Sequence, residues 1–319
     1  MPFATVNTGI WFYGLGGPGA GFWERQFSDE GSINVQWFGA SAAISDNTSS
    51  IQNTIDFASS FGYNVFIPKG NYSVSTILLK SYVHIFGEGY LSILQFRLDL
   101  DPNPFIFFVD TQSGSVANNI KNVRISNIKF TPGSFTTLSE YKHFIFVNGV
   151  SDLTIERCHS QFRGDAICIG AGNGITPPTQ HITHNENITI RDCVFDGVTK
   201  QNRNAISILD CKNALIENNS FINTTRSDMP GAIDIEPNPT PSGTCNEILK
   251  NIIIQNNSFY NIGGIAPFVV KLPGYPFTIP ASGIYFRNNR LENVTGGVNF
   301  WYKYVPAGGI EVKKNLAFY

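Results

Sequence analysis

Two carboxylates stand two residues apart in the stretch GAIDIEPNPT, residues 231–240. Asp234 and Glu236 alternate there with Ile233 and Ile235, as they would on a β-strand whose isoleucines face a core. Glycoside hydrolysis needs one carboxylic acid to protonate the leaving oxygen and one carboxylate to act as base or nucleophile. By strand rise the two Cα atoms lie about 6.5–7 Å apart, between the separations of retaining and inverting enzymes. The pair is therefore a candidate catalytic site, and the alternative is a solvated acidic strand end.

Six segments around these residues share a pattern whose centres are 30, 35, 26, 38 and 32 residues apart. Three columns of equivalent positions follow from it: Ile125, Ile155, Ile190, Ile216, Ile254 and Phe286; then Asn127, Arg157, Asp192, Asn218, Asn256 and Asn288; then Phe130, Ser160, Phe195, Phe221, Phe259 and Leu291. Aligned apolar columns predict a parallel β-solenoid, in which Asn suits the turns because it tolerates left-handed backbone angles and its amide can bond to the next rung. A β-sandwich, the alternative, would show hairpin turns and alternating polarity.

Composition agrees with a large, mostly β fold, since the 319 residues are 14% charged and 13% aromatic and include 30 glycines. The net charge of −2 gives no basic field, so nucleic acid is not an expected partner. No apolar run approaches the roughly 20 residues that span a membrane, so membrane insertion is not expected. The five cysteines lack metal-type spacing, and neither a metal nor a cofactor is expected.

A short helix should precede the solenoid, because residues 45–62 combine N-cap residue types with an apolar face and a final glycine. Its start candidates are Ser45, Asp46 and Asn47, its apolar face Ile51, Ile55 and Ala58, and its end Gly62. An amphipathic helix can cover the open end of a solenoid. We expect a leader over 1–40, the capping helix with the first rungs over 41–100, and the β-helix with the glycan site over 101–319.

The residues INVQWFGA, DNTSSIQNTIDFASSFGYNVFIPKGNYSV and LLKSYVHIFGEG, between about 33 and 95, resemble the opening of the pectate-lyase-like superfamily. The resemblance implies an all-β, right-handed parallel β-helix. Bacteriophage tailspike depolymerases are most similar, because they combine this opening with a Trp- and Gly-rich leader, here GFWERQFSDEGSINVQWFGA (21–40). That resemblance implies a homotrimer on the virion tail that is made in the host cytoplasm and cleaves bacterial surface polysaccharide outside the cell.

The solenoid gives the acid pair neighbours. With the isoleucines inward, two outward columns contain Phe146, Cys168, Ser207, Asp234, Val269 and Asn299, and Asn148, Gly170, Leu209, Glu236, Lys271 and Trp301. These columns should form an exposed sugar-binding face, with Trp301 and Tyr302 as stacking platforms. Lys271 beside Glu236 should hold that carboxylate ionised, which leaves Asp234 as the proton donor unless the roles are exchanged.

Asp165 is a third candidate acid, two rungs from Asp234 on the same face. Gly164-Asp165 partly resembles the Gly-Asp-Asp motif of polygalacturonase-type hydrolases, but Ala166 replaces the second acid. Further candidates for substrate binding lie in loops that lead into these strands or follow them: Arg163, Arg203, Asp210, Arg226 and Asp228. The arginines could clamp an acidic sugar or pair with the neighbouring aspartates.

These features favour an endo-acting glycoside hydrolase of capsular or O-antigen polysaccharide. A polysaccharide lyase is the first alternative, because Lys271 and the arginines could supply the base and the neutralising charge that uronate elimination needs. A non-catalytic, glycan-binding or structural β-helix is the second.

Overall fold

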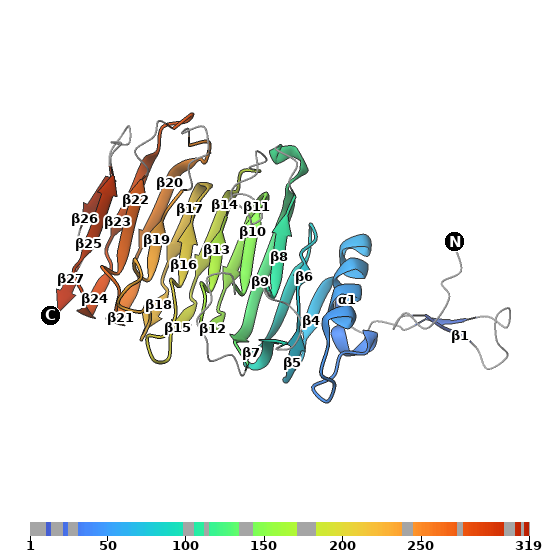
Figure 1. The fold of residues 1–319 in the computed structure, drawn as a ribbon. Coiled ribbons are helices and arrows are strands. Elements are labelled where there is room, and N and C mark those ends of the chain that lie inside the picture. Colours follow the sequence, from blue (N-terminus) through green and yellow to red (C-terminus); the bar gives the residue numbers. More distant parts are fainter. Residues whose placement is uncertain are drawn as a thin grey trace.

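The computed structural model describes residues 11–13, 22–24, 31–97, 105–111, 115–133, 143–170, 183–237, 245–272, 277–302, 310–313 and 316–318. The chain folds as the predicted right-handed parallel β-helix, in which successive rungs follow one another in sequence order from α1 at one end to β25–β27 at the other (Figure 1). Three parallel sheets, here called I, II and III, run along the solenoid.

Sheet I carries the predicted acid pair. Its strands are β6 (Ile77–Leu78), β8 (Phe107–Asp110), β10 (Ile145–Asn148), β13 (Ile167–Ile169), β16 (Ile206–Ile208), β19 (Ile233–Ile235), β22 (Phe268–Leu272) and β25 (Val298–Tyr302).

Sheet II follows sheet I in each later rung. It contains β3 (Ser32–Asn34), β4 (Asn64–Ile67), the first parts of β7 (His84–Phe96) and β9 (Ile120–Thr131), β11 (Val150–Glu156), β14 (Glu186–Arg191), β17 (Cys211–Glu217), β20 (Leu249–Gln255), β23 (Ser282–Arg287) and β26 (Ile310–Lys313).

Sheet III completes each rung. It contains β5 (Gly70–Val74), the later parts of β7 and β9, β12 (His159–Gln161), β15 (Val194–Asp196), β18 (Ser220–Ile222), β21 (Ser258–Ile262), β24 (Arg290–Val294) and β27 (Leu316–Phe318).

The core lies inside the three sheets, and the predicted apolar columns line it. Ile190, Ile216 and Ile254 pair in register along sheet II and are fully buried. On sheet III the rings of Phe195 and Phe221 stack with centroids 4.9 Å apart, and Phe221 stacks on Phe259 at 4.6 Å. The repeat period therefore gave the correct register.

The predicted turn column adopts left-handed backbone angles, with φ between 51° and 57° at Asn127, Arg157, Asp192, Asn218, Asn256 and Asn288. The amide ladder, however, is formed one residue later. The backbone N–H of Asn219 donates to Oδ1 of Asn257 at 2.9 Å, and that of Asn257 donates to Oδ1 of Asn289 at 2.9 Å. These side chains are buried, so the residue that turns the chain and the residue that ties the rungs are different.

The helix α1 (Thr48–Phe61) follows the predicted boundaries. Ile51, Ile55 and Ala58 are fully buried, and Gly62 ends the helix in the left-handed conformation at φ 76°. The Asn47 side chain does not cap the helix but accepts a hydrogen bond from the Ser41 backbone N–H at 2.7 Å. The helix covers the first rungs (Figure 1), as a solenoid cap requires.

Two 3₁₀ turns, η1 (Val35–Phe38) and η2 (Val116–Asn118), complete the helical elements of the described residues. Within the expected leader, β1 (Trp11–Tyr13) and β2 (Phe22–Glu24) pair antiparallel with each other. The division at residues 40 and 100 stays a prediction. Among the residues that the structure describes, no helix is both long enough and apolar enough to cross a membrane.

Candidate functional site

The predicted outward column of sheet I is confirmed at the level of the backbone. Ser207 pairs with Cys168 on one side and with Asp234 on the other, and Asp234 pairs in turn with Val269. Gly231 lets the segment that enters β19 pass closely over its neighbour, because a Cβ there would lie 2.0 Å from the Ala266 carbonyl oxygen.

The predicted exposure of this column is wrong. Phe146, Cys168, Ser207, Asp234 and Val269 all face outward, yet all are buried. At the β10 end, rings from separate segments cover the column: Phe105 lies 5.4 Å from Phe146 and 5.9 Å from His143, measured between ring centroids. The outward face is thus a covered layer of side chains and not a bare strand surface.

Asp234 lies in the middle of this layer with only 2% of its surface exposed. Burial raises the pKa of its carboxyl well above the usual value, and the charges of Asp165 and Glu236 raise it further. A hydrogen bond from Ser207 and the charge of Arg203 act in the opposite direction. Its Oδ1 atom accepts no hydrogen bond from any residue that the structure describes. Asp234 therefore keeps its proton to higher pH than an exposed aspartate does.

Asp165 is also buried and lies just before β13, two rungs from the strand of Asp234. Its Oδ1 accepts a hydrogen bond from the Asn204 backbone N–H at 3.1 Å and lies 3.4 Å from Nε of Arg203. Its Oδ2 lies 3.7 Å from Nδ1 of His143. Sequence reasoning predicted Asp165 and Arg203 but assigned no site role to His143 or Asn204. Asn204 could have been found from the register, because it is the equivalent of Asp165 one rung on.

Glu236 and Lys271 form the predicted ion pair on the neighbouring column. Their side chains are 32% and 48% exposed, so the layer opens to solvent at this side. The backbone N–H of Glu236 donates to the carbonyl of Ile208 at 3.1 Å, which extends the strand pairing beyond β19. Asp165 and Glu236 thus both act on Asp234 through their charges, and of the three acids one is partly exposed and two are buried.

Arg163 lies in the segment that enters β13. Its Nε and Nη1 atoms are buried and donate no hydrogen bond to the described residues. Arg203, in the segment that enters β16, also places Nη1 3.3 Å from Sδ of Met229. Both arginines come from the predicted loops, and Arg203 makes the acid contact that sequence reasoning offered as the alternative to a clamp.

Asp210 lies elsewhere, at the turn between sheets I and II. It is fully buried, accepts from the backbone N–H of Asn185 at 2.9 Å and of Ile248 at 2.6 Å, and lies 2.8 Å from Nδ1 of His184. These contacts account for its side chain as part of the turn, and we do not include it in the site.

Arg226 and Asp228 form an exposed ion pair in the loop after β18. This pairing of an arginine with an aspartate is the alternative to a sugar clamp that the sequence left open. The hydrogen bond from Arg226 lowers the pKa of Asp228, and the charge of Arg203 also contributes. Trp301 and Tyr302 pair through their backbones with Lys271 and Leu272, and their side chains lie outside the described part of the chain. No group of three or more His, Cys, Asp or Glu side chains suited to a metal ion occurs in the ranges described above.

Comparison with known proteins agrees with this fold. The family model described as "Rhamnogalacturonase A/epimerase, pectate lyase-like" matches residues 32–138, about a third of the chain. This match confirms the resemblance seen in the N-terminal sequence. A comparison with curated protein sequences gives no match.

Three solved structures illustrate the likeness. An iota-carrageenase complexed to iota-carrageenan fragments has a TM-score of 0.60 at 16% identity, over 86% of this chain and 57% of that one. A family 28 exopolygalacturonase of Yersinia enterocolitica has a TM-score of 0.58 at 15% identity, over 93% and 67%. A tailspike double mutant of E. coli bacteriophage HK620, in complex with a pentasaccharide, has a TM-score of 0.62 at 16% identity, over 97% and 53%.

The chain spans about three fifths of the length of the structures that it matches. At these identities the likeness establishes a parallel β-helix of the kind found in polysaccharide-degrading hydrolases and in a phage tailspike.

Proposed function

We propose that the chain is an endo-acting glycoside hydrolase that depolymerises a bacterial surface polysaccharide. The observation that carries this proposal is the environment of Asp234, a buried carboxyl whose pKa is raised by burial and by two neighbouring carboxylates. An acid whose pKa is raised keeps its proton to higher pH than an exposed aspartate does, and it can transfer that proton to a glycosidic oxygen. A solvated acidic strand end would have an ordinary pKa instead.

Glu236 completes the proposed pair as base or nucleophile. Its carboxylate forms an ion pair with the ammonium group of Lys271 at the open side of the layer, and the reaction needs such a second carboxylate beside the proton donor. Asp165 acts on Asp234 through its charge and holds that proton in place. Substrate approaches from the Glu236 and Lys271 side, where the layer is open. Oδ1 of Asp234 and Nε and Nη1 of Arg163 make no hydrogen bond with the described residues, and we assign these atoms to contacts with the sugar.

The proposed substrate and location follow the structures that share the fold, which include carbohydrate hydrolases and a phage tailspike bound to a pentasaccharide. We extend the proposal to a homotrimer on a virion tail that acts outside the bacterial cell. Trp301 and Tyr302 are proposed sugar platforms at the end of sheet I. Light scattering should give three times the 35.2 kDa mass of the chain. A mass equal to that of one chain would refute the proposed trimer.

The proposal is tested by incubating the protein with capsular and O-antigen polysaccharides and analysing the products by mass spectrometry and NMR. Asp234→Asn and Glu236→Gln should each reduce the rate by about 10²–10⁴-fold. Glu292→Gln is the matched control, because Glu292 is an exposed, ion-paired acid on sheet III. Unchanged rates in both site variants would refute the assignment, and product ends that absorb ultraviolet light would indicate a lyase.

Binding of a glycan without cleavage is the second candidate function, and one observation favours it. Asp234 is 2% exposed, whereas a general acid must reach the oxygen that it protonates. In that case a polysaccharide would bind with equal affinity to the parent protein and to Asp234→Asn, and no product would form over days. Cleavage that depends on Asp234 would exclude this candidate.

A further inference from the structure

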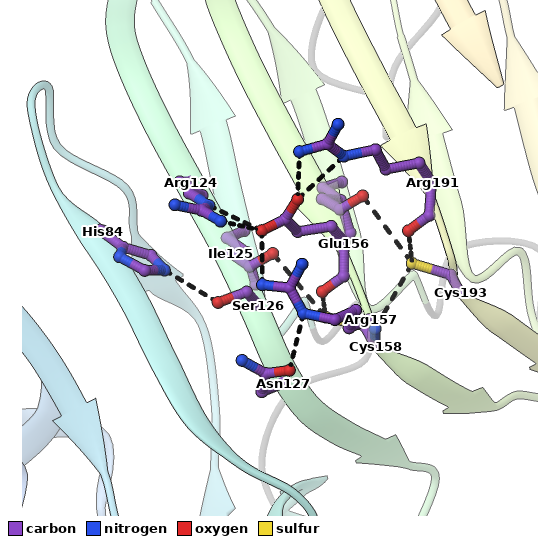
Figure 2. Close-up of polar contacts among 11 residues, drawn as sticks. His84, Arg124, Ile125, Ser126, Asn127, Glu156, Arg157, Cys158, Arg191 and Cys193 are labelled. Atoms are coloured by element: carbon purple, nitrogen blue, oxygen red, sulfur yellow. Dashed lines mark hydrogen bonds and ion pairs between the residues drawn. The ribbon is translucent and has the colours of Figure 1, made fainter. Parts of the chain in front are cut away.

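A second group of charged side chains lies on the outward face of sheet II and around the turn that leads to sheet III. The carboxylate of Glu156 is fully buried among three guanidinium groups, those of Arg124, Arg157 and Arg191 (Figure 2). We call these three residues the arginine cluster. Oε1 accepts from Nε of Arg124 at 2.8 Å and from Nη2 of Arg157 at 2.7 Å. Oε2 accepts from Nε and Nη2 of Arg191 at 2.9 and 2.6 Å.

The arginine cluster has more N–H donors than the carboxylate of Glu156 accepts. A guanidinium carries five N–H groups, and each of the three arginines uses two, including the bond from Arg157 to Asn127. The Nη1 atom of each donates no hydrogen bond within the part of the chain that the structure describes. The three side chains are 45%, 46% and 43% exposed, so these donors can be reached from solvent.

The excess positive charge lies towards Arg124 and Arg157. Arg191 has two acids near it, Asp192 and Glu217, which help to raise its pKa after the effect of Glu156. On the other side lies His84, whose Nε2 is 2.8 Å from the hydroxyl of Ser126. Burial lowers the pKa of His84, and the charges of Arg124 and Arg157 lower it further against the opposing effect of Glu156. An imidazole is neutral or cationic, so the histidine cannot balance the charge of the guanidiniums.

An exposed aromatic ring lies at the same turn. The strand β7 is irregular between Phe86 and Ile93, where residues 87–92 bulge outward and present Tyr90 at 59% exposure. The bulge rests on Asn127, since a Cβ at Gly87 would lie 2.7 Å from its carbonyl oxygen. Nε of Arg157 donates to Oδ1 of the same Asn127 at 3.1 Å, and Tyr90 packs 4.7 Å from the ring of His159.

We propose that the arginine cluster and Tyr90 form a second binding site, which takes an acidic saccharide through a carboxylate or sulfate group. A planar guanidinium with free N–H groups matches the oxygens of either anion, and an exposed tyrosine ring can pack against a sugar. Glu156 holds the guanidiniums in place across three successive rungs. The site lies on sheets II and III, so it would anchor a chain away from the acids of sheet I and does not depend on the catalytic role of Asp234.

The test is isothermal titration at low ionic strength with four probes: oligogalacturonate, sulfated dextran fragments, neutral maltohexaose and sodium sulfate. We expect saturable binding of one or both acidic saccharides and none of maltohexaose. Arg157→Gln should weaken binding at least tenfold, because it removes one of the two guanidiniums that carry the excess charge. The variant should still fold, because Arg124 and Arg191 continue to bind Glu156. Arg290→Gln, which removes an exposed arginine of sheet III, should leave the affinity unchanged.

The four probes distinguish the sources of the anion. A preference for oligogalacturonate identifies a carboxylate site, and a preference for sulfated dextran identifies a sulfate site. Equal losses in Arg157→Gln and Arg290→Gln, or binding of maltohexaose as tight as that of the acidic saccharides, would overturn the proposal. Binding of sodium sulfate alone, without either saccharide, would overturn it too.

A measurement on the parent protein guards against a folding defect in the variant. Side-chain NMR signals of the arginine Nη groups should shift for Arg124 and Arg157 when oligogalacturonate or sulfated dextran is added, and should not shift for Arg290. Shifts spread over all arginines would show nonspecific attraction and contradict the proposed site.

Discussion

Asp234 and Glu156 are both buried carboxyl groups, yet their pKa values move in opposite directions. Glu156 lies among three guanidiniums, and their hydrogen bonds and charges outweigh the cost of burial and lower its pKa to about 2. Asp234 has one hydroxyl donor and two carboxylates as neighbours, so burial and repulsion raise its pKa. The carboxyl group of Glu156 on sheet II thus stays ionised to lower pH than usual, whereas that of Asp234 on sheet I keeps its proton to higher pH than usual.

The first prediction concerns Asp234 and the dependence of stability on pH. Because its pKa is raised on folding, its favourable contribution is complete below the ordinary aspartate pKa and is lost as pH rises through the raised value. Asp234→Asn mimics the protonated acid. The free energy of unfolding, measured with urea at several pH values, should therefore fall with rising pH in the parent relative to the variant. Parallel curves would contradict the raised pKa.

The second prediction concerns Glu156, for which the sign is reversed. Its pKa falls from 4.5 to about 2 on folding, so its contribution is present above the unfolded value and is lost as pH falls from about 4.5 to about 2. A shift of this size corresponds to about 3 kcal/mol. Glu156→Gln should show a smaller loss of stability than the parent as pH falls through that window, and Glu292→Gln should behave as the parent does. Acid-unfolding curves measured by circular dichroism would decide this.

Some site residues could be read from the sequence and others could not. The repeat period placed Ser207, Asp234 and Lys271 on adjacent rungs, because a fixed register determines which residues of neighbouring strands lie side by side. The same alignment also places Ser126, Glu156 and Arg191 in one column, directly after the central isoleucines. The three residue types share no chemistry that a repeat would make visible, so the column alone does not predict an ion-pair cluster.

At the scale of the element, the rungs are tied by a buried ladder of asparagine amides. Nδ2 of Asn257 donates to the Ile216 carbonyl at 3.0 Å, and its Oδ1 accepts the backbone N–H of Asn219. The ladder satisfies backbone groups at the turn between sheets II and III that strand pairing leaves open. Loss of one amide would leave buried donors and acceptors without partners.

The third prediction follows from this ladder. Asn257→Ala should lower the free energy of unfolding by at least about 2 kcal/mol, because it leaves the Asn219 N–H and the Ile216 carbonyl unsatisfied and each such buried group costs about 1–3 kcal/mol. Asn256→Gly is the matched control: Asn256 is exposed, its φ is 56°, and glycine adopts this angle without strain. The control should stay within about 0.5 kcal/mol. Similar losses in both variants, measured by denaturant unfolding, would remove the special role of Asn257.

The covering of sheet I could not be predicted from the repeat. Phe105 and His143 come from the segments that enter β8 and β10, which lie four and three rungs before β19. By register they share a column with Asp165 and Asn204, but the repeat does not show that their rings pack on the outward face. Repeat periods determine which residues share a strand face. Whether that face is open depends on turns and loops, where the repeat is least regular.

At the scale of the whole molecule, the solenoid is nearly one-dimensional, since each rung pairs only with the rungs before and after it. Stability in such a fold is the sum of rung and interface contributions, and an uncovered end exposes core. The helix α1 supplies the cover at the N-terminal end, with Ile51 and Ile55 fully buried. A substitution that destabilises α1 should therefore destabilise the first rungs most and the distant rungs least.

The fourth prediction tests this local behaviour with Ile55→Asp. A buried charge without a partner costs several kcal/mol, so α1 should detach from the first rungs. Amide hydrogen exchange, followed by mass spectrometry, should become at least tenfold faster in β3, β4 and β5 and stay unchanged in β17 and β20. Asn53→Asp adds the same charge to the exposed side of α1 and should leave exchange unaltered. Uniform acceleration in all rungs would mean that the solenoid unfolds as one cooperative unit, so that α1 stabilises the whole chain and not only its end.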